Sequence, residues 1–253
     1  MIPEDDRGLL LSDGLFETIL AVDGVPRRLD RHLDRLARGC AVLGLAPPDP
    51  AALRAAAEGA LAQVGGEGRA AVRLTLTAGS GRGLDRPEGS AARLIATAFP
   101  APTPQGPVTL ATVGLRRNET SPASRIKSLS YLDNVLARRQ ARALGAEEAV
   151  MLNTAGELAC AAAANLFWIA GDRLFTPALA CGVLDGITRA EVLAAAAAIG
   201  VEAVEARSGP QALEQAQAVF VTNSLIGLRP AAALDGRPLA GHPLVDALSS
   251  RCR

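Results

Sequence analysis

The feature that most constrains the fold of this chain is a proline-rich stretch near its middle. Residues 100–107 read PAPTPQGP, with four prolines in eight residues. Proline fixes φ and removes an N–H donor, so such a stretch is extended and stiff and does not continue a helix or a central strand. We therefore predict a linker at 101–107 that separates a small N-terminal domain, residues 1–100, from a larger C-terminal domain, residues 108–253.

Both predicted domains alternate between strand and helix patterns, which is typical of a mixed α/β (α+β) fold. The expected strands cover 15–22, 25–29, 70–77, 93–99, 108–115, 148–152, 165–170, 174–175 and 218–222. The expected helices begin after the caps Asp30 and Asp49, near Ser130 and at Gly186. The glycine-rich residues 79–90 predict a mobile loop.

The composition argues against several classes of protein. The 26 basic residues balance 26 acidic ones, so nothing indicates a nucleic-acid partner or an anionic membrane surface. No apolar run is long enough to cross a membrane, and the acidic first residues do not resemble a secretory signal. The four cysteines lack CxxC spacing, which predicts reduced thiols in a cytoplasmic protein. His32 and His242 are far apart in sequence, and we expect no metal site.

The basic residues are unusually uneven, because 25 are arginine and one, Lys127, is lysine. Frequent Ala, Gly, Arg and Pro suggest a coding bias that replaces lysine wherever arginine serves as well. A guanidinium stays protonated and is not nucleophilic, so it cannot replace an amine that must attack a carbonyl. Lys127, beside Ile126 and Leu129, is therefore a candidate for covalent chemistry. A surface lysine retained by chance agrees equally well with the composition.

Three further segments are candidates for binding a phosphorylated cofactor. Gly186-Ile187-Thr188 opens an expected helix, whose free N–H groups favour an anion, although a capped helix without a ligand is the commoner case. Arg35 lies on the first expected helix, where a solvated arginine is the alternative. Thr222-Asn223-Ser224 lies at the end of the strand at 218–222, where small polar groups often face a ligand and turn chemistry is the alternative. With a covalent lysine, these groups suit a phosphorylated aldehyde.

Six segments resemble the class IV aminotransferase family, the fold-type IV pyridoxal-phosphate enzymes. They are DRGLLLSDGLFETI (6–19), RHLDRL (31–36), RIKSLSYLDNVLARRQARALGAEEAVMLN (125–153), ANLFWI (164–169), CGVLDGITR (181–189) and FVTNSLIG (220–227). Their order and spacing are those of the family, from about residue 7 to 230. The resemblance implies two α/β domains with pyridoxal 5'-phosphate in the crevice between them. It also implies a homodimer in which the loop at 79–90 closes the partner's site.

The resemblance assigns roles to individual residues of this chain. Lys127 matches the lysine that binds the cofactor covalently, and Leu184 matches the apolar residue packed on the pyridine ring. The phosphate contacts of the family correspond to Arg35, Ile187, Thr188 and Ser224.

One position departs from the family pattern. The family has a glutamate on the pyridine nitrogen, five residues before the Asn of ANLFWI, and this chain has Cys160 there. A thiol is a weak donor and cannot act as a carboxylate. Glu157 is three residues away, and in a regular strand that odd spacing places it on the opposite face unless a bulge intervenes. The departure is compatible with chemistry that needs less electron withdrawal, with a shifted register, or with weak or lost activity.

Two segments distinguish activities within the family. GSGRGL (79–84) and TNSLIGLRP (222–230) resemble 4-amino-4-deoxychorismate lyases more than aminotransferases. The resemblance implies a small, amino-acid-like substrate and a role in folate synthesis. The alternatives are a D-amino-acid or branched-chain aminotransferase, and a catalytically silent family member that binds the cofactor or another ligand.

Overall fold

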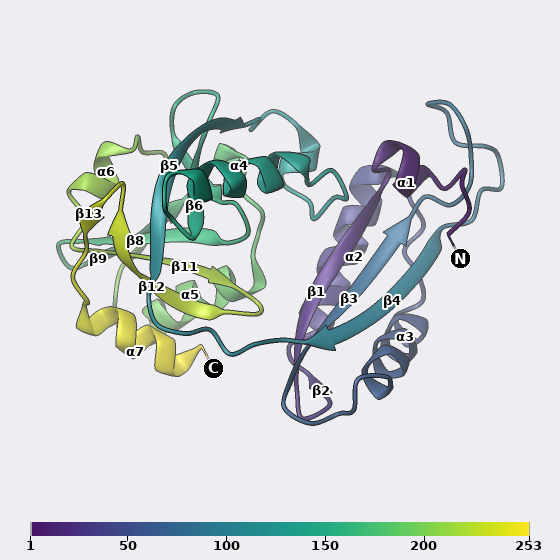
Figure 1. Ribbon diagram of the computed structural model, residues 1–253, viewed down its shortest axis with the longest axis horizontal. Coiled ribbons are helices and arrows are strands. Elements are labelled where there is room, and N and C mark those ends of the chain that lie inside the picture. The colour runs from purple at the N-terminus through teal and green to yellow at the C-terminus, as the bar shows by residue number, and fades with distance from the viewer. Residues whose placement is uncertain (1, 253) are drawn as a thin grey trace. The chain divides into compact units, whose positions relative to one another are not determined.

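The computed structural model describes residues 2–252, which form two compact units (Figure 1). Unit 1 comprises Met1–Thr103 and Ile126–Ser130, and unit 2 comprises Pro104–Arg125 and Tyr131–Arg253. The chain thus enters unit 2, returns to unit 1 with the short segment that contains Lys127, and then completes unit 2. The prediction of one boundary at 101–107 did not include this return of residues 126–130 to unit 1.

Unit 1 is a four-stranded antiparallel sheet in the order β2-β1-β3-β4, with two long helices on one face (Figure 1). Its elements are α1 (Arg7–Leu11), β1 (Gly14–Val22), β2 (Val25–Pro26), α2 (Leu29–Leu43), α3 (Pro50–Ala62), β3 (Arg69–Thr77) and β4 (Arg93–Pro100). Alternate residues of β1 and β3, such as Ile19 and Val72, share a core with Leu36 of α2 and Leu53 of α3. The period of two that predicted these strands therefore marks the face that the helices cover.

The two predicted helix caps of unit 1 have different outcomes. The Asp49 side chain caps α3 and accepts a hydrogen bond from the N–H of Ala51 at 3.1 Å, as predicted. The prediction for Asp30 is wrong, because α2 begins two residues earlier than expected, at Leu29, after Arg28 in a left-handed conformation with φ 57°. Asp30 lies instead in the first turn, where its charge still complements the helix N-terminus.

Unit 2 contains a nine-stranded mixed sheet in the order β10-β9-β8-β11-β12-β5-β6-β7, with β13 paired to β12. Its strands are β5 (Val108–Arg117), β6 (Glu148–Asn153), β7 (Leu158–Ala161), β8 (Asn165–Ala170), β9 (Arg173–Pro177), β10 (Ala203–Ala206), β11 (Ala218–Asn223), β12 (Gly227–Leu234) and β13 (Arg237–Pro238). Its helices are α4 (Leu132–Ala143), α5 (Ile187–Ala198), α6 (Gln211–Glu214) and α7 (Pro243–Arg251), with 3₁₀ turns at Pro122–Ser124 and Leu179–Cys181.

The sheet of unit 2 curls around one apolar core. Residues of β5, β6, β7, β8, β11 and β12 share a cluster, which includes Leu110, Val150, Leu158, Trp168, Val221 and Leu234. Helix α4 packs on the outer face of β5 and β6 through Ala137 and Ala141. Helices α5 and α7 cover the outer face of β8 and β11, where Phe167 and Phe220 stack with their ring centroids 5.0 Å apart. Each outer face is therefore buried under its own helices.

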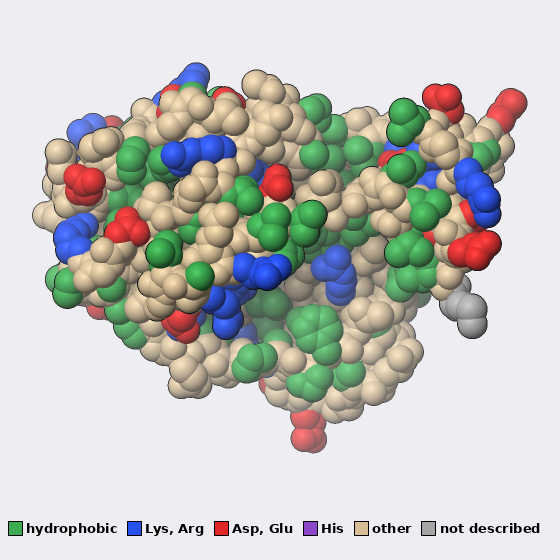
Figure 2. All heavy atoms as spheres, turned by 45° about the horizontal axis from the view of Figure 1, so that its top comes forward, with side chains coloured by type: hydrophobic (Ala, Val, Ile, Leu, Met, Phe, Trp, Pro, Cys, Tyr) green, Lys and Arg blue, Asp and Glu red, His purple; other side chains and the backbone are tan. Residues whose placement is uncertain are grey.

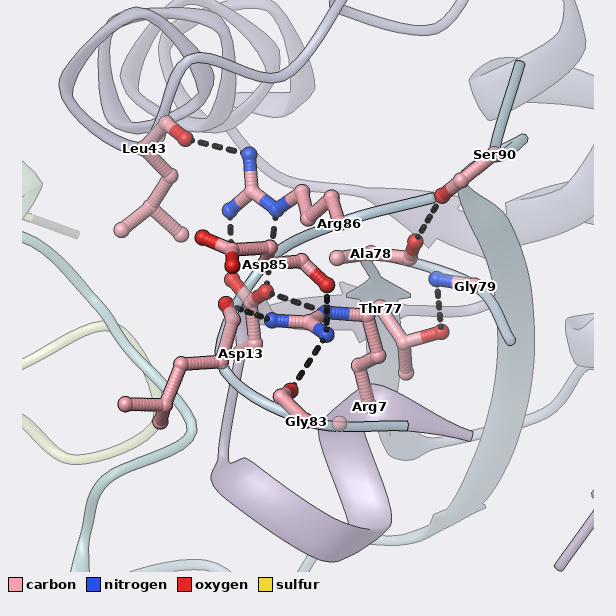
Figure 3. Close-up of polar contacts among 12 residues, drawn as sticks. Arg7, Asp13, Leu43, Thr77, Ala78, Gly79, Gly83, Asp85, Arg86 and Ser90 are labelled. Atoms are coloured by element: carbon pink, nitrogen blue, oxygen red, sulfur yellow. Dashed lines mark hydrogen bonds and ion pairs between the residues drawn. The ribbon is translucent and has the colours of Figure 1, made fainter. Parts of the chain in front are cut away.

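The loop at 79–90 is anchored, although its glycines predict mobility (Figure 3). The guanidinium of Arg7 is buried and donates to the carbonyl oxygens of Gly83, Leu84 and Asp85 at 2.9, 2.8 and 3.1 Å. Its Nε donates to the carboxylate of Asp13 at 2.9 Å, and Arg86 of the loop binds the same carboxylate. A buried arginine that is hydrogen-bonded on three sides therefore fixes the path of the loop.

Basic and acidic side chains are scattered among neutral and apolar ones over the face drawn in Figure 2. In the described part of the chain, no helix is both long and apolar enough to span a membrane. Residues 2–252 also hold no group of three or more His, Cys, Asp or Glu side chains arranged for a metal ion. All four cysteines are buried and free.

Candidate active site

Lys127 lies on a short segment that pairs with the edge of β1. The N–H of Phe16 donates to the carbonyl of Lys127 at 2.9 Å, and the N–H of Leu129 donates to the carbonyl of Gly14 at 3.0 Å. An antiparallel bridge joins Leu15 and Ser128 between these two bonds. Main-chain hydrogen bonds at Lys127 and Leu129, one on each side of Ser128, thus hold this segment on the sheet of unit 1.

The side chain of Lys127 lies against an aromatic ring that sequence reasoning missed. Its Nζ is 4.2 Å from the ring centroid of Phe16, whose side chain is buried. The guanidinium carbon of Arg73 lies 3.9 Å from the same centroid. A ring face attracts a cation, so Phe16 contacts both the amine of Lys127 and the guanidinium of Arg73. Lys127 is therefore a partly buried amine beside a second cation and not a freely solvated surface lysine.

Arg35 is buried on α2, where its guanidinium binds the carboxylate of Glu17 on β1. Nε donates to Oε1 at 2.8 Å and Nη2 donates to Oε2 at 2.7 Å. His32 Nδ1 lies 2.7 Å from the same Oε2. Burial works to raise the pKa of Glu17, but Arg35 and His32 outweigh it and lower that pKa to about 2. Burial lowers the pKa of His32, and the charges of Arg35 and Lys127 lower it further, against the opposing effect of Glu17.

The start of α5 is built around Asn165 at the beginning of β8. Asn165 Nδ2 donates to the carbonyl of Leu184 at 2.9 Å. A Cβ added to Gly186 would lie 2.0 Å from Asn165 Oδ1, so only glycine fits at this N-cap. The helix has no side-chain cap, and Ile187 and Thr188 in its first turn are buried. Unit 2 thus brings the predicted residues Leu184, Ile187 and Thr188 together at the first residue of β8.

Ser224 lies in the turn that follows β11, beside the same end of β8. The last residue of β11, Asn223, accepts hydrogen bonds at its Oδ1 from the N–H groups of Leu225 and Ile226, both at 2.9 Å. Its Nδ2 donates to the carbonyl of Ala163 at 2.9 Å. Thr222 pairs with Asn165 across the two strands. Asn223 therefore ties the turn that contains Ser224 to the residues that lead into β8.

Cys160 lies in β7, opposite Met151 of β6, and its thiol is buried in an apolar cluster with Cys181 and Ala137. Burial raises the pKa of this thiol, and the charge of Glu148 adds to the rise while that of Arg117 opposes it. The Oε1 of Glu148 accepts from the N–H groups of Ala149 and Ala162 at 2.9 and 3.1 Å. The thiol of Cys160 is therefore neutral near pH 7.

Glu157 is on the same side of the sheet as Cys160, contrary to the expectation for a regular strand. The register of β6 and β7 shifts between the pairs Met151–Cys160 and Leu152–Leu158, which leaves a bulge at Ala159. The Glu157 carboxylate accepts from Asn153 Nδ2 at 2.8 Å and from Arg207 Nε at 2.8 Å. The thiol of Cys181 is 3.6 Å from its Oε2. The bulge thus places Glu157 on the face of the sheet opposite to the expected one, and hydrogen bonds from Asn153 and Arg207 hold its carboxylate there.

Residues 14–234 match the family described as amino-transferase class IV. A Methanocaldococcus jannaschii protein, provisionally named a branched-chain-amino-acid aminotransferase, is 33% identical over 92% of this chain and 82% of its own length. The aminodeoxychorismate lyase of Bacillus subtilis is 30% identical over 89% of this chain and 78% of its own.

A solved structure from Legionella pneumophila, provisionally named 4-amino-4-deoxychorismate lyase, has a TM-score of 0.92 and 30% identity to this chain. The match covers 98% of this chain and 92% of the other. The mixed α/β fold in two units is therefore that of the fold-type IV enzymes, as the sequence motifs predicted. Together with the family match over residues 14–234, this likeness shows that the chain belongs to the class IV aminotransferase family of enzymes.

Proposed function

We propose that this chain is a pyridoxal-phosphate-dependent lyase that eliminates pyruvate from 4-amino-4-deoxychorismate and leaves 4-aminobenzoate. The observation that carries the proposal is Lys127, the sole lysine, whose backbone is paired with β1 and whose amine lies over Phe16. The segments at 79–84 and 222–230 favour the lyase over the aminotransferases.

The start of α5 suits the phosphate of the cofactor. Helix α5 begins at a glycine without a side-chain cap, so its first N–H groups are available to bind an anion. We propose that the N–H of Ile187 and the side chains of Arg35, Thr188 and Ser224 bind the phosphate. Because two N–H groups of Arg35 bind Glu17, the plane of its guanidinium is fixed before any ligand arrives. Leu184, which Asn165 holds through its carbonyl, would pack on the pyridine ring.

Lys127 has two tasks in the proposed reaction. Bound pyridoxal phosphate supplies a ring that withdraws electrons from the α-carbon of an attached amine. Lys127 would hold the cofactor covalently, and its amine, when not so bound, would take the α-proton of the substrate as a general base. Backbone pairing to β1 keeps the main chain in place, so the side chain alone moves between the tasks. The ring of Phe16 stabilises the ammonium that forms when Lys127 takes the proton.

Cys160 would make the environment of the ring nitrogen unlike that of the family. A neutral, buried thiol supplies no negative charge to keep a proton on that nitrogen. Electron withdrawal would then be weaker, which slows steps that place negative charge on the α-carbon. Covalent attachment to Lys127 needs only an amine and an aldehyde, so it is unaffected.

We propose that the protein is a cytoplasmic homodimer. Four buried free thiols agree with a reducing compartment. Exposed leucines on α1 and on the loop at 79–90 support a second copy as the partner, since Leu9 is 66% and Leu84 is 86% exposed. Arg7 of α1 binds the carbonyl of Leu84, so the leucines of α1 and Leu84 lie on segments that are held together.

Reduction with borohydride tests the covalent role of Lys127. The purified protein should be yellow, and reduction should abolish the colour and leave a cofactor adduct on the peptide that contains Lys127, found by mass spectrometry. Lys127→Ala and Lys127→Arg should lack the adduct, because neither side chain can form the bond. An adduct that survives in Lys127→Ala would contradict the proposal.

Substrate assays separate the lyase from its alternatives. The lyase should release pyruvate from 4-amino-4-deoxychorismate without consuming a 2-oxo acid. The second candidate is a branched-chain or D-amino-acid aminotransferase, which the similarity to the archaeal protein supports. Such an enzyme would instead require 2-oxoglutarate or another 2-oxo acid as acceptor of the amino group. A silent family member would bind the cofactor and turn over neither substrate.

A further inference from the structure

Thr222 has a buried hydroxyl without a hydrogen-bond partner among the described residues. It lies on β11, its side chain is 0% exposed, and its Oγ1 is also shielded from solvent. A hydroxyl has one donor and two acceptor sites, and an unsatisfied one in a protein interior lowers stability. A valine of nearly the same shape would pack in this place without that loss. The hydroxyl therefore suggests a partner outside the chain.

The neighbours of Thr222 show which way its side chain points. Thr222 pairs directly with Asn165 across β11 and β8, and directly paired residues project from the same face of a sheet. Phe220 and Phe167, two residues further along each strand, stack on that face and pack against Val192 of α5. Thr222 therefore lies on the face of the sheet that α5 covers, next to Asn165.

Asn165 in turn lies against the first residues of α5. Its Oδ1 occupies the space that a Cβ of Gly186 would need, and its Nδ2 donates to the carbonyl of Leu184. The helix that starts at Ile187 runs for 12 residues and has no side-chain cap. An unpartnered hydroxyl and uncapped N–H groups thus lie on the two sides of Asn165.

We infer that the Thr222 hydroxyl donates a hydrogen bond to a phosphate monoester bound at the start of α5. This inference rests on the proposed function and adds a residue to the four assigned to the phosphate from the family resemblance. The hydroxyl and the helix N-terminus would provide donors to different oxygens of one dianion; among residues 2–252 the hydroxyl has no hydrogen-bond partner and the helix N-terminus has no side-chain cap.

Calorimetric titration of apo protein with pyridoxal phosphate and, separately, with pyridoxal tests this contact. Thr222→Val removes the hydroxyl and keeps the shape, whereas Thr222→Ser keeps the hydroxyl. A hydrogen bond to a charged group corresponds to at least about tenfold in affinity. Thr222→Val should therefore weaken pyridoxal phosphate binding at least about tenfold, leave pyridoxal binding within about twofold, and not lower the melting temperature of the apo protein. Thr222→Ser should bind pyridoxal phosphate like the parent.

Thr176 provides the matched control, because its hydroxyl is equally buried in unit 2 but donates to the carbonyl of Leu166 at 2.8 Å. Thr176→Val should lower the melting temperature of the apo protein and leave the affinity for pyridoxal phosphate unchanged. The two variants thus separate loss of a structural hydrogen bond from loss of a ligand contact.

Three results would overturn the inference. If Thr222→Val binds pyridoxal phosphate as tightly as the parent, the hydroxyl has no role in binding, while the proposed function stands. If it weakens pyridoxal phosphate and pyridoxal equally, the hydroxyl acts on the fold. If the parent binds neither compound, the proposed function fails and the inference fails with it. Should Thr222→Val not fold, Thr222→Ala removes the same hydroxyl and is judged by the same comparison.

Discussion

Replacing Glu17 by glutamine should destabilise unit 1 strongly near neutral pH. Glu17 is fully buried, and its carboxylate accepts two hydrogen bonds from Arg35 and one contact from His32. Glutamine keeps the shape but removes the negative charge. The guanidinium of Arg35, itself buried, would then lose the anion that compensates it.

The size of the effect follows from the pKa of Glu17. The native state lowers this pKa from 4.5 to about 2. At about 1.4 kcal/mol for each pH unit, the ionised form contributes about 3 kcal/mol to the free energy of unfolding at pH 7. This agrees with the ~3–5 kcal/mol typical of removing one partner from a buried ion pair.

The sign of the pH dependence is fixed by the lowered pKa. The contribution is fully present above pH 4.5 and is lost as the pH falls toward 2, because the unfolded state then binds a proton that the native state does not. The difference between parent and Glu17→Gln should therefore shrink to about 1.5 kcal/mol at pH 3. Urea unfolding of the apo protein, followed by far-ultraviolet circular dichroism at pH 7 and pH 3, measures it. The single tryptophan, Trp168, lies in unit 2 and serves as a separate probe of that unit.

Glu202 offers the control, because its pair with Arg173 is on the surface at 3.9 Å. Glu202→Gln should change the free energy of unfolding by less than about 1 kcal/mol at either pH. A loss below about 1 kcal/mol for Glu17→Gln at pH 7, or a loss of equal size at pH 7 and pH 3, would refute the reasoning from the buried pair.

Two further predictions concern the ring nitrogen and the assembly. Cys160→Glu should raise the rate of pyruvate release, because a carboxylate would hold a proton on the ring nitrogen. Cys160→Gln has the same size but no charge, and it should leave the rate unchanged. If the parent is already strongly active and Cys160→Glu does not change its rate, the electron withdrawal comes from elsewhere. Light scattering should give twice the 25.9 kDa mass of one chain at micromolar concentration, and Leu9→Lys with Leu84→Lys should shift it toward the monomer because both leucines are exposed. A parent that scatters as a monomer would contradict the homodimer.

Local chemistry made several elements predictable from the sequence. The pair Asp23-Gly24 forms the expected tight turn, with φ of 51° and 76°. Gly145 and Gly200 end α4 and α5 in left-handed conformations with φ of 81° and 73°. The periodicity of β1 and β3 gave their extent to within one residue. The rules behind these predictions act over a few neighbouring residues.

Features that depend on contacts far apart in sequence were not predictable. The loop at 79–90 is held by Arg7, which is 77 positions away from Leu84 in sequence. The composition of the loop shows only its glycines, which predict mobility. Arg35 binds Glu17, and Lys127 lies over Phe16. Glu17 and Phe16 are neighbours on β1 and project from opposite faces of the sheet, and a sequence motif does not show which of the two residues meets which partner. The bulge at Ala159 comes from the register of two strands, which the four alanines after Cys160 do not encode.

The return of Ile126–Ser130 to unit 1 has a consequence for how the chain matures on the ribosome. A nascent chain that has emerged only as far as Thr103 can form its four-stranded sheet, but β1 then has an unpaired edge, with the N–H of Phe16 and the carbonyl of Gly14 unbonded. Such an edge is open to other strands until Lys127 and Leu129 have been synthesised. The segment that carries the reactive amine is therefore also the one that completes the sheet, so a chain truncated before it would lack both.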